Sequence, residues 1–268
     1  MIKAVFIDID DTLLNSQREI TENTKIAIQK CMEKGIKIIL TSGRSRNNTL
    51  KFQEMLKTSP YIISSNGADV YDIREQKEIY INAISKEALR KLFNYSQEND
   101  CKIALNYGLE LAMNKMFYPD EEINVKTTEE LIEIINNKKV LQCVISNRDI
   151  DEIIKFKKWL AKEITEVKIE NESKRLKNLV LKPSKHYYCD ITSSTTSKGS
   201  GVVKMCEYLD LQLEDIVTIG DGENDISMFE VAGGAVAMGN ATEKVKAKAK
   251  YVTETHDNEG VAKFLEKI

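Results

Sequence analysis

Residues Ala4 to Leu14 read AVFIDIDDTLL. An apolar run typical of a strand buried in a parallel sheet is followed at once by three carboxylates, Asp8, Asp10 and Asp11. Ionised carboxylates are costly to bury unless a cation or hydrogen bonds compensate them, and a bound metal ion is the simplest compensation. On this stretch alone, a strand that runs into a polar turn capped by Asp11 or Thr12 fits equally well.

Length and composition indicate a globular chain. Its 268 residues suffice for one large domain or two ordinary ones, and 42% of them are hydrophobic and 30% charged. The formal charge of −3 does not favour a nucleic acid or an anionic membrane as partner. No apolar run approaches the roughly 18 residues of a membrane span, and the amino terminus leads directly into a core strand. We therefore expect a cytoplasmic protein, either a monomer or a small homo-oligomer.

The first third of the chain alternates strands and helices. A helix is expected between Thr21, which can cap it, and Gly35, where it would stop. Strands are expected at residues 36–41 and 61–64, with a helix between them that runs to about Lys57. This alternation predicts an α/β fold with a doubly wound parallel sheet, followed by a short hairpin over residues 70–80.

The middle third follows a different pattern, in which neighbouring strands lack intervening helices. Such strands suggest a mixed or antiparallel sheet, and therefore a second α/β domain at residues 83–183. After it, a strand at 187–191, a helix at 197–209 and a strand at 216–219 resume the alternation. We therefore predict that residues 1–82 and 184–268 form one domain and that the second domain is inserted into it.

Polar residues lie at four places in the predicted core, at the edge where the carboxyl ends of parallel strands converge and helix amino termini also point. Magnesium is bound through one or two carboxylates and shares its remaining positions with water and phosphate. A lysine and a serine hydroxyl beside it would contact the other phosphoryl oxygens. One carboxylate can act as nucleophile, and a second, two residues on, leaves room for a general acid and base. The four places supply Asp8 with Asp10, then Ser42, then Lys198, then Asp221 with Asn224 and Asp225.

With these four motifs in this order, the chain resembles the haloacid dehalogenase (HAD) superfamily. The resemblance implies a HAD-like, Rossmannoid core in which Asp8 is the nucleophile and Asp10 the general acid and base. It also makes the Asp10 backbone carbonyl and Asp221 ligands of Mg²⁺. The insertion, with Ser65-Asn66-Gly67-Ala68 just before it, looks like the α/β cap of the Cof-type (type IIB) hydrolases. That cap selects among small phosphorylated metabolites, often sugar phosphates.

The site residues expected from the motifs and the resemblance fall into three groups. The groups are catalytic (Asp8, Asp10, Ser42, Lys198), substrate-binding (Ser42, Gly43, Arg44, Lys198, Asn224) and metal-binding (Asp8, Asp10, Asp221, Asp225). Each motif alone has a structural alternative: Ser42 could only cap a helix, Lys198 could be a surface residue, and Asn224 with Asp225 could only form a turn.

Three functions are compatible with this site. The leading hypothesis is a magnesium-dependent phosphatase that acts on a small metabolite through an aspartyl-phosphate. A hexose phosphomutase of the same architecture is the second, and a regulatory binding protein without turnover is the third. The complete set of carboxylates and the lysine count against the third.

Overall fold

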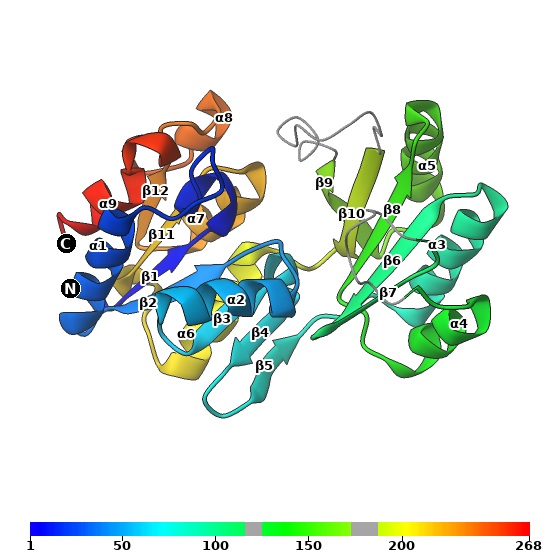
Figure 1. Ribbon diagram of the computed structural model, residues 1–268, viewed down its shortest axis with the longest axis horizontal. Coiled ribbons are helices and arrows are strands. Elements are labelled where there is room, and N and C mark those ends of the chain that lie inside the picture. Colours follow the sequence, from blue (N-terminus) through cyan, green and yellow to red (C-terminus); the bar gives the residue numbers. More distant parts are fainter. Residues whose placement is uncertain (116–124, 173–186) are drawn as a thin grey trace. The chain divides into compact units, whose positions relative to one another are not determined.

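The computed structural model describes residues 1–115, 125–172 and 187–268 and divides the chain into two compact units (Figure 1). The first unit is built from two segments, Met1–Ile81 and Thr196–Ile268, and the second is Asn82–Thr195. The second unit is therefore an insertion in the sequence of the first.

The first unit contains one eight-stranded sheet in the order β13-β12-β11-β1-β2-β3-β4-β5. Strands β13 to β3 of this order are parallel, whereas β3, β4 and β5 pair antiparallel at one edge. The strands are β1 (Ala4–Ile7), β2 (Lys37–Thr41), β3 (Tyr61–Ser64), β4 (Asp69–Asp72), β5 (Lys77–Ile81), β11 (Ile216–Gly220), β12 (Gly234–Ala237) and β13 (Tyr251–Val252). The helices are α1 (Glu22–Glu33), α2 (Arg46–Leu56), α6 (Lys198–Leu209), α7 (Ile226–Val231), α8 (Glu243–Lys246) and α9 (Gly260–Leu265).

Strand β1 shows why this sheet is covered on both faces. Its four residues are fully buried and alternate between two hydrophobic clusters. Val5 and Ile7 pack in the cluster that includes residues of α1 and α9, whereas Ala4 and Phe6 pack in the cluster that includes residues of α6 and α7. This arrangement confirms the predicted doubly wound α/β core.

The second unit contains a five-stranded antiparallel sheet in the order β7-β6-β8-β10-β9. Alternate residues such as Ile103, Leu105, Ile145 and Ile191 pack with the apolar faces of three helices into one hydrophobic cluster. The elements are α3 (Lys86–Glu98), β6 (Lys102–Tyr107), β7 (Glu110–Met113), α4 (Thr128–Asn137), β8 (Gln142–Asn147), α5 (Ile150–Glu163), β9 (Val167–Glu172) and β10 (Tyr187–Ser193).

The carboxyl-terminal boundary predicted for the insertion, residue 183, is wrong. Strand β10 does not resume the first sheet, because it pairs antiparallel with β8 and β9 and belongs to the second unit. Its inward residues Cys189 and Ile191 are fully buried in the second unit's core. A short apolar strand has the same sequence pattern in either sheet, so pairing partners alone decide where it belongs. A further strand expected at residues 177–182 lies outside the described residues.

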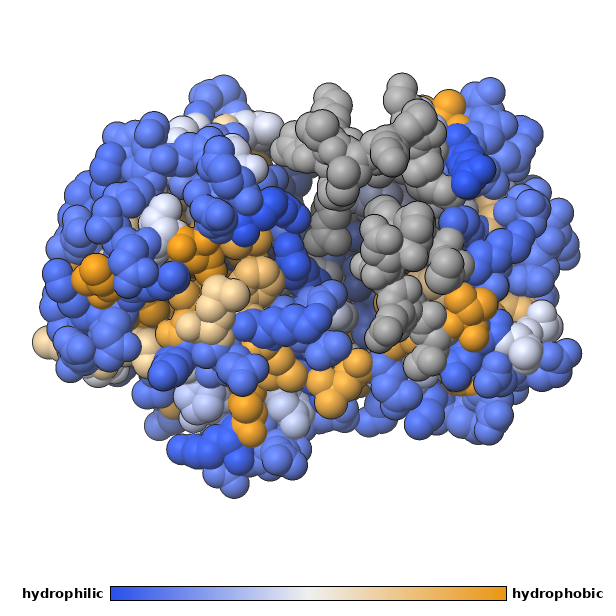
Figure 2. Space-filling model, in the orientation of Figure 1, coloured by the Kyte–Doolittle hydropathy of each residue, from blue (hydrophilic) through white to orange (hydrophobic). Residues whose placement is uncertain are grey.

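Hydrophilic residues dominate the face of the molecule seen in Figure 2, as the 30% of charged residues would suggest. Within the described part of the chain, each helix is too short or too polar to cross a lipid bilayer.

Candidate active site

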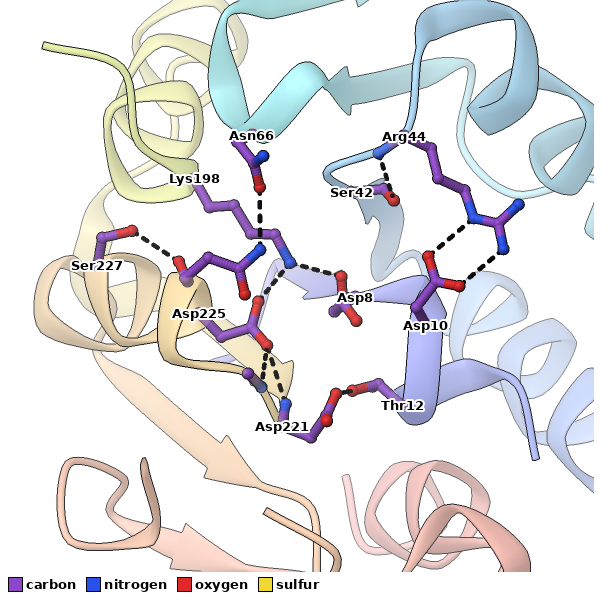
Figure 3. A network of polar contacts seen from close by, with 12 residues as sticks. Asp8, Asp10, Thr12, Ser42, Arg44, Asn66, Lys198, Asp221, Asp225 and Ser227 are labelled. Atoms are coloured by element: carbon purple, nitrogen blue, oxygen red, sulfur yellow. Dashed lines mark hydrogen bonds and ion pairs between the residues drawn. The ribbon is translucent and has the colours of Figure 1, made fainter. Parts of the chain in front are cut away.

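The turn after β1 separates two of the predicted carboxylates. Asp8 is 5% exposed, and its N–H donates to a carbonyl of β11 at 3.0 Å, which continues the pairing of the two strands. In the following turn, Ile9–Leu13, Asp10 is extended and Asp11 is left-handed with φ 58°. Figure 3 shows the Asp8 carboxylate directed toward Lys198, whereas Asp10 points away from it.

Lys198 is the first residue of α6 and is only 1% exposed. The helix begins here because the Ser197 hydroxyl accepts a hydrogen bond from the Ser200 N–H at 3.0 Å. The Lys198 ammonium donates to Asp8 Oδ1 and Asp225 Oδ1, each at 2.5 Å. Burial by itself would lower the pKa of Lys198, but the carboxylates of Asp225 and Asp8 outweigh it and raise the pKa above its ordinary value. Lys198 is therefore an interior cation, which excludes the alternative that it is a surface residue at a helix start.

Three carboxylates converge beside this lysine. One oxygen each of Asp8, Asp221 and Asp225 lies within 4.8 Å of the others. Burial, with a smaller contribution from Asp225, raises the pKa of Asp221 to about 7, although the Thr12 hydroxyl donates to Asp221 Oδ1 at 2.7 Å. Burial likewise raises the pKa of Asp8 well above its ordinary value. Asp225 Oδ2 accepts from the N–H groups of Asp221 and Gly222 at 2.9 and 2.8 Å.

This donor set fits a hard divalent cation. Such ions prefer carboxylate oxygens. One ammonium beside two buried carboxylates, Asp8 and Asp225, and the half-buried Asp221 leaves an excess of negative charge that a cation would compensate. The two oxygens of Asp225 already bind the lysine and the backbone of the loop, whereas Asp8 and Asp221 are less committed.

The loop after β2 carries the next motif. Ser42 is fully buried, and its hydroxyl accepts from the Arg44 N–H at 3.1 Å. The Arg44 guanidinium donates to both oxygens of Asp10, at 2.8 and 2.7 Å, and Arg18 lies 3.2 Å from the same carboxylate. The sequence predicts that Arg44 binds substrate, and in this structure its side chain pairs with both oxygens of Asp10. Sequence reasoning did not foresee this contact.

Asn224 contacts a residue to which the motifs gave no role. Its side-chain N–H group donates to Asn66 Oδ1 at 2.9 Å (Figure 3). Asn66 follows β3, so it lies at the same edge of the sheet as the other site residues. The signal that could have revealed it is the polar sequence Ser65-Asn66 at the end of a buried strand. The Thr12 contact with Asp221 was missed as well.

The comparison with known proteins identifies the family. A family model for haloacid dehalogenase-like hydrolases matches residues 5–265. The chain belongs to this family. It is 28% identical over 264 residues to the 5-amino-6-(5-phospho-D-ribitylamino)uracil phosphatase YcsE of Bacillus subtilis, a match that covers 98% of this chain and 94% of the relative.

Solved structures of HAD proteins agree with this membership. A haloacid dehalogenase-like hydrolase from Bacteroides thetaiotaomicron has a TM-score of 0.85 and 26% identity, with 100% of this chain and 99% of that chain covered. The HAD subclass IIB sugar phosphatase BT4131 has a TM-score of 0.79 and 27% identity, with 99% and 98% covered. Our protein is thus a Cof-type HAD phosphatase, which confirms the resemblance and the enzyme class drawn from the four motifs.

Proposed function

We propose that this HAD phosphatase hydrolyses phosphate monoesters of small polyhydroxylated metabolites, with Mg²⁺ as cofactor and Asp8 as nucleophile. The observation that carries the proposal is the group of Asp8, Lys198 and Asp225, all buried, and the half-buried Asp221, with Asp10 two residues beyond Asp8. A buried carboxylate beside a cation, at the end of a rigid strand, is positioned to attack an electrophilic phosphorus.

In the first step, a carboxylate oxygen of Asp8 forms a bond to phosphorus while the bond between phosphorus and the leaving oxygen breaks. Asp10 donates a proton to the departing alcohol, and the product on the enzyme is an aspartyl-phosphate. In the second step, Asp10 takes a proton from water, which attacks the phosphorus and releases inorganic phosphate and free Asp8. Arg44 holds both oxygens of Asp10, so it orients the acid and base for both steps.

Asp8, Asp221 and the Asp10 backbone carbonyl would hold the Mg²⁺, and Asp225 would support them by binding the backbone of Asp221 through Oδ2. When bound, the cation neutralises charge on the phosphoryl oxygens. The protein supplies the remaining contacts. Lys198 provides a fixed positive charge in a buried site, where it costs no reorganisation during reaction.

The Ser42 loop would bind the phosphoryl oxygens from another side. The Ser42 hydroxyl can donate a hydrogen bond in addition to the one it accepts from Arg44 N–H. Gly43 adds a backbone N–H in a loop tied to β3, because the Ser42 N–H donates to Ile63 at 2.9 Å. We assign Asn224 to the same task, with its orientation set by Asn66.

The choice of substrate would depend on the second unit. One face of its sheet packs on α3, α4 and α5, and the alternate residues carry hydrogen-bonding side chains to the opposite face. These include Asn106 opposite Gln142, Lys102 opposite Ser146, and Asp190 on the next strand. Hydroxyl groups of a sugar or polyol are recognised by such mixed donors and acceptors. The names of YcsE and BT4131, which refer to a ribityl phosphate and to sugar phosphates, support the same substrate class.

The test is a panel of phosphorylated sugars, polyols and nucleotides, assayed for released phosphate with Mg²⁺. We expect the sugar and polyol phosphates to have the highest kcat/KM. Gln142→Leu should change their ranking while an aryl phosphate is hydrolysed as before, and Gln97→Leu, an exposed glutamine of α3, is the matched control. Interconversion of hexose phosphates with little phosphate release would indicate a phosphomutase instead.

A further inference from the structure

Asn66 carries a buried hydrogen-bond donor that the described part of the protein leaves unused. Its side chain is 0% exposed, and Nδ2 has no hydrogen-bond partner among the described residues. Oδ1, in contrast, accepts from Asn224 at 2.9 Å, and Nδ2 is the other atom of the same amide group. A buried unpaired donor costs free energy unless something outside the chain satisfies it.

The backbone at this position is strained in a way that fits a functional residue. Ser65 and Asn66 have consecutive left-handed conformations, with φ 49° and 57°. Such values are uncommon for residues other than glycine and persist only where surrounding contacts enforce them. Here the Ser65 N–H donates to Arg44 O at 2.7 Å and the Asn66 N–H donates to Ser42 O at 3.0 Å.

These contacts place the free donor against the loop of Ser42 and Gly43. A Cβ atom built on Gly43 would lie 3.1 Å from Asn66 Nδ2, so the lack of a side chain at Gly43 makes room for the amide. In Figure 3 the Asn66 side chain extends toward Lys198, and Ser42 lies across from it in the view.

We propose that Asn66 Nδ2 donates a hydrogen bond to a non-bridging oxygen of the phosphoryl group, which makes Asn66 a further substrate-binding residue. The proposal rests on the proposed function, because it assigns one more contact in the same site. The donor is neutral, buried and held by Asn224, so it is oriented before substrate arrives. A bound phosphoryl oxygen would supply the acceptor that Nδ2 lacks.

Two variants test whether the Asn66 side chain donates a hydrogen bond to substrate or only supports Asn224. Asn66→Gly tolerates the left-handed backbone and removes both polar atoms. Asn66→Asp keeps an acceptor for Asn224 but replaces the donor with an oxygen that carries negative charge, so the uncharged Asn66→Gly is needed beside it. Asp210→Gly is the matched control, because Asp210 is also left-handed, with φ 52°, and is exposed at the end of α6.

The measurements are kcat/KM for an aryl phosphate, the inhibition constant of orthovanadate and the unfolding temperature. Vanadate binds as a mimic of the five-coordinate phosphorus of phosphoryl transfer. Loss of one preorganised donor typically costs about 10²- to 10³-fold, so both variants should lose kcat/KM on this scale and bind vanadate correspondingly less tightly. The control should match the wild type in both.

Wild-type kcat/KM in Asn66→Asp would overturn the proposal, because the acceptor alone would then explain the residue. A loss of kcat/KM with unchanged vanadate inhibition would also overturn it. If Asn66→Gly does not fold, Asn66→Ala replaces it, because it also removes both polar atoms without adding charge, and wild-type kcat/KM in that variant would overturn the proposal. A wild-type enzyme that releases no phosphate from any substrate would refute the proposed function itself, which is a different result.

Discussion

The Lys198 ammonium donates a 2.5 Å hydrogen bond to Asp8 across 190 residues of sequence. Because Lys198 also binds Asp225 at 2.5 Å, one cation joins the strand end of β1 to the loop after β11. The two segments that form the first unit are thereby tied together at the proposed reaction centre.

Replacement of Lys198 by methionine should remove both a phosphoryl contact and the counter-charge of two buried carboxylates. We expect kcat/KM to fall by about 10²- to 10³-fold, the typical cost of losing one preorganised electrostatic contact. Without Mg²⁺, the unfolding temperature should fall as well, because Asp8 and Asp225 then repel each other. Lys204→Met is the control, since the Lys204 side chain lies on the same helix, is 42% exposed and pairs with Glu207. Equal activity in the two variants would contradict the role given to Lys198.

A divalent cation should stabilise the folded protein through Asp221 even when no substrate is present. An ion that binds only the folded state raises its stability by RT ln(1 + [ion]/Kd). We therefore expect Mg²⁺ to raise the unfolding temperature of the wild type and of Asp210→Asn, but to have little effect on Asp221→Asn. Differential scanning fluorimetry over a range of Mg²⁺ concentrations measures this change in unfolding temperature.

Ca²⁺ should bind at the same site and inhibit phosphate release, since its longer and looser coordination would misplace the nucleophile. Full turnover in excess chelator would refute the metal assignment.

Much of the site could be predicted because its residues lie directly next to strands and helices that the local sequence is sufficient to recognise. The apolar run of β1 ends at Asp8, and Ser197 caps the helix that begins with Lys198. Each of these features depends on a few neighbouring residues, and the parallel sheet then brings the strand ends to one edge.

Contacts set only by tertiary packing could not be predicted. The bidentate pairing of Arg44 with Asp10 spans 34 residues and needs two loops to approach each other. Asn66 Nδ2 lacks a partner among the residues that the structure describes, while Asn224, 158 residues away in the sequence, binds Oδ1 of the same side chain. Strand β10 was assigned to the wrong sheet for a similar reason, since the alternation of Cys189 and Ile191 fits either one.

The bidentate pairing of Arg44 with Asp10 should contribute most to turnover of substrates whose leaving group must be protonated. In Arg44→Lys the charge remains, but a lysine cannot hold both oxygens of Asp10 in one plane as the guanidinium does. We expect kcat/KM to fall more for a sugar phosphate than for an aryl phosphate, whose phenolate leaves without assistance. Arg90→Lys, at an arginine of α3 that contacts Asn136, controls for the substitution itself. An equal loss for both substrates would assign Arg44 to the phosphoryl group instead of Asp10.

Replacement of Asp8 and replacement of Asp10 should block different steps of the reaction. Asp8→Asn removes the nucleophile, so no phosphoenzyme can form and turnover should vanish for every substrate. Asp10→Asn leaves the nucleophile in place but can neither donate a proton to the alcohol nor take one from water, a loss that typically costs about 10²- to 10⁴-fold. With an aryl phosphate the first step should be mildly affected, and phosphoenzyme should accumulate because its hydrolysis is slow.

Rapid quench with ³²P-labelled aryl phosphate separates these cases, because label bound to precipitated protein reports the covalent intermediate. Asp10→Asn should retain label for longer than the wild type, and Asp8→Asn should retain none. The asymmetry has a structural basis: Asp8 faces Lys198 within the carboxylate group, whereas Asp10 is held outside it by Arg44. Label on Asp8→Asn at the wild-type level would require another nucleophile, and the roles assigned to both residues would then have to be abandoned.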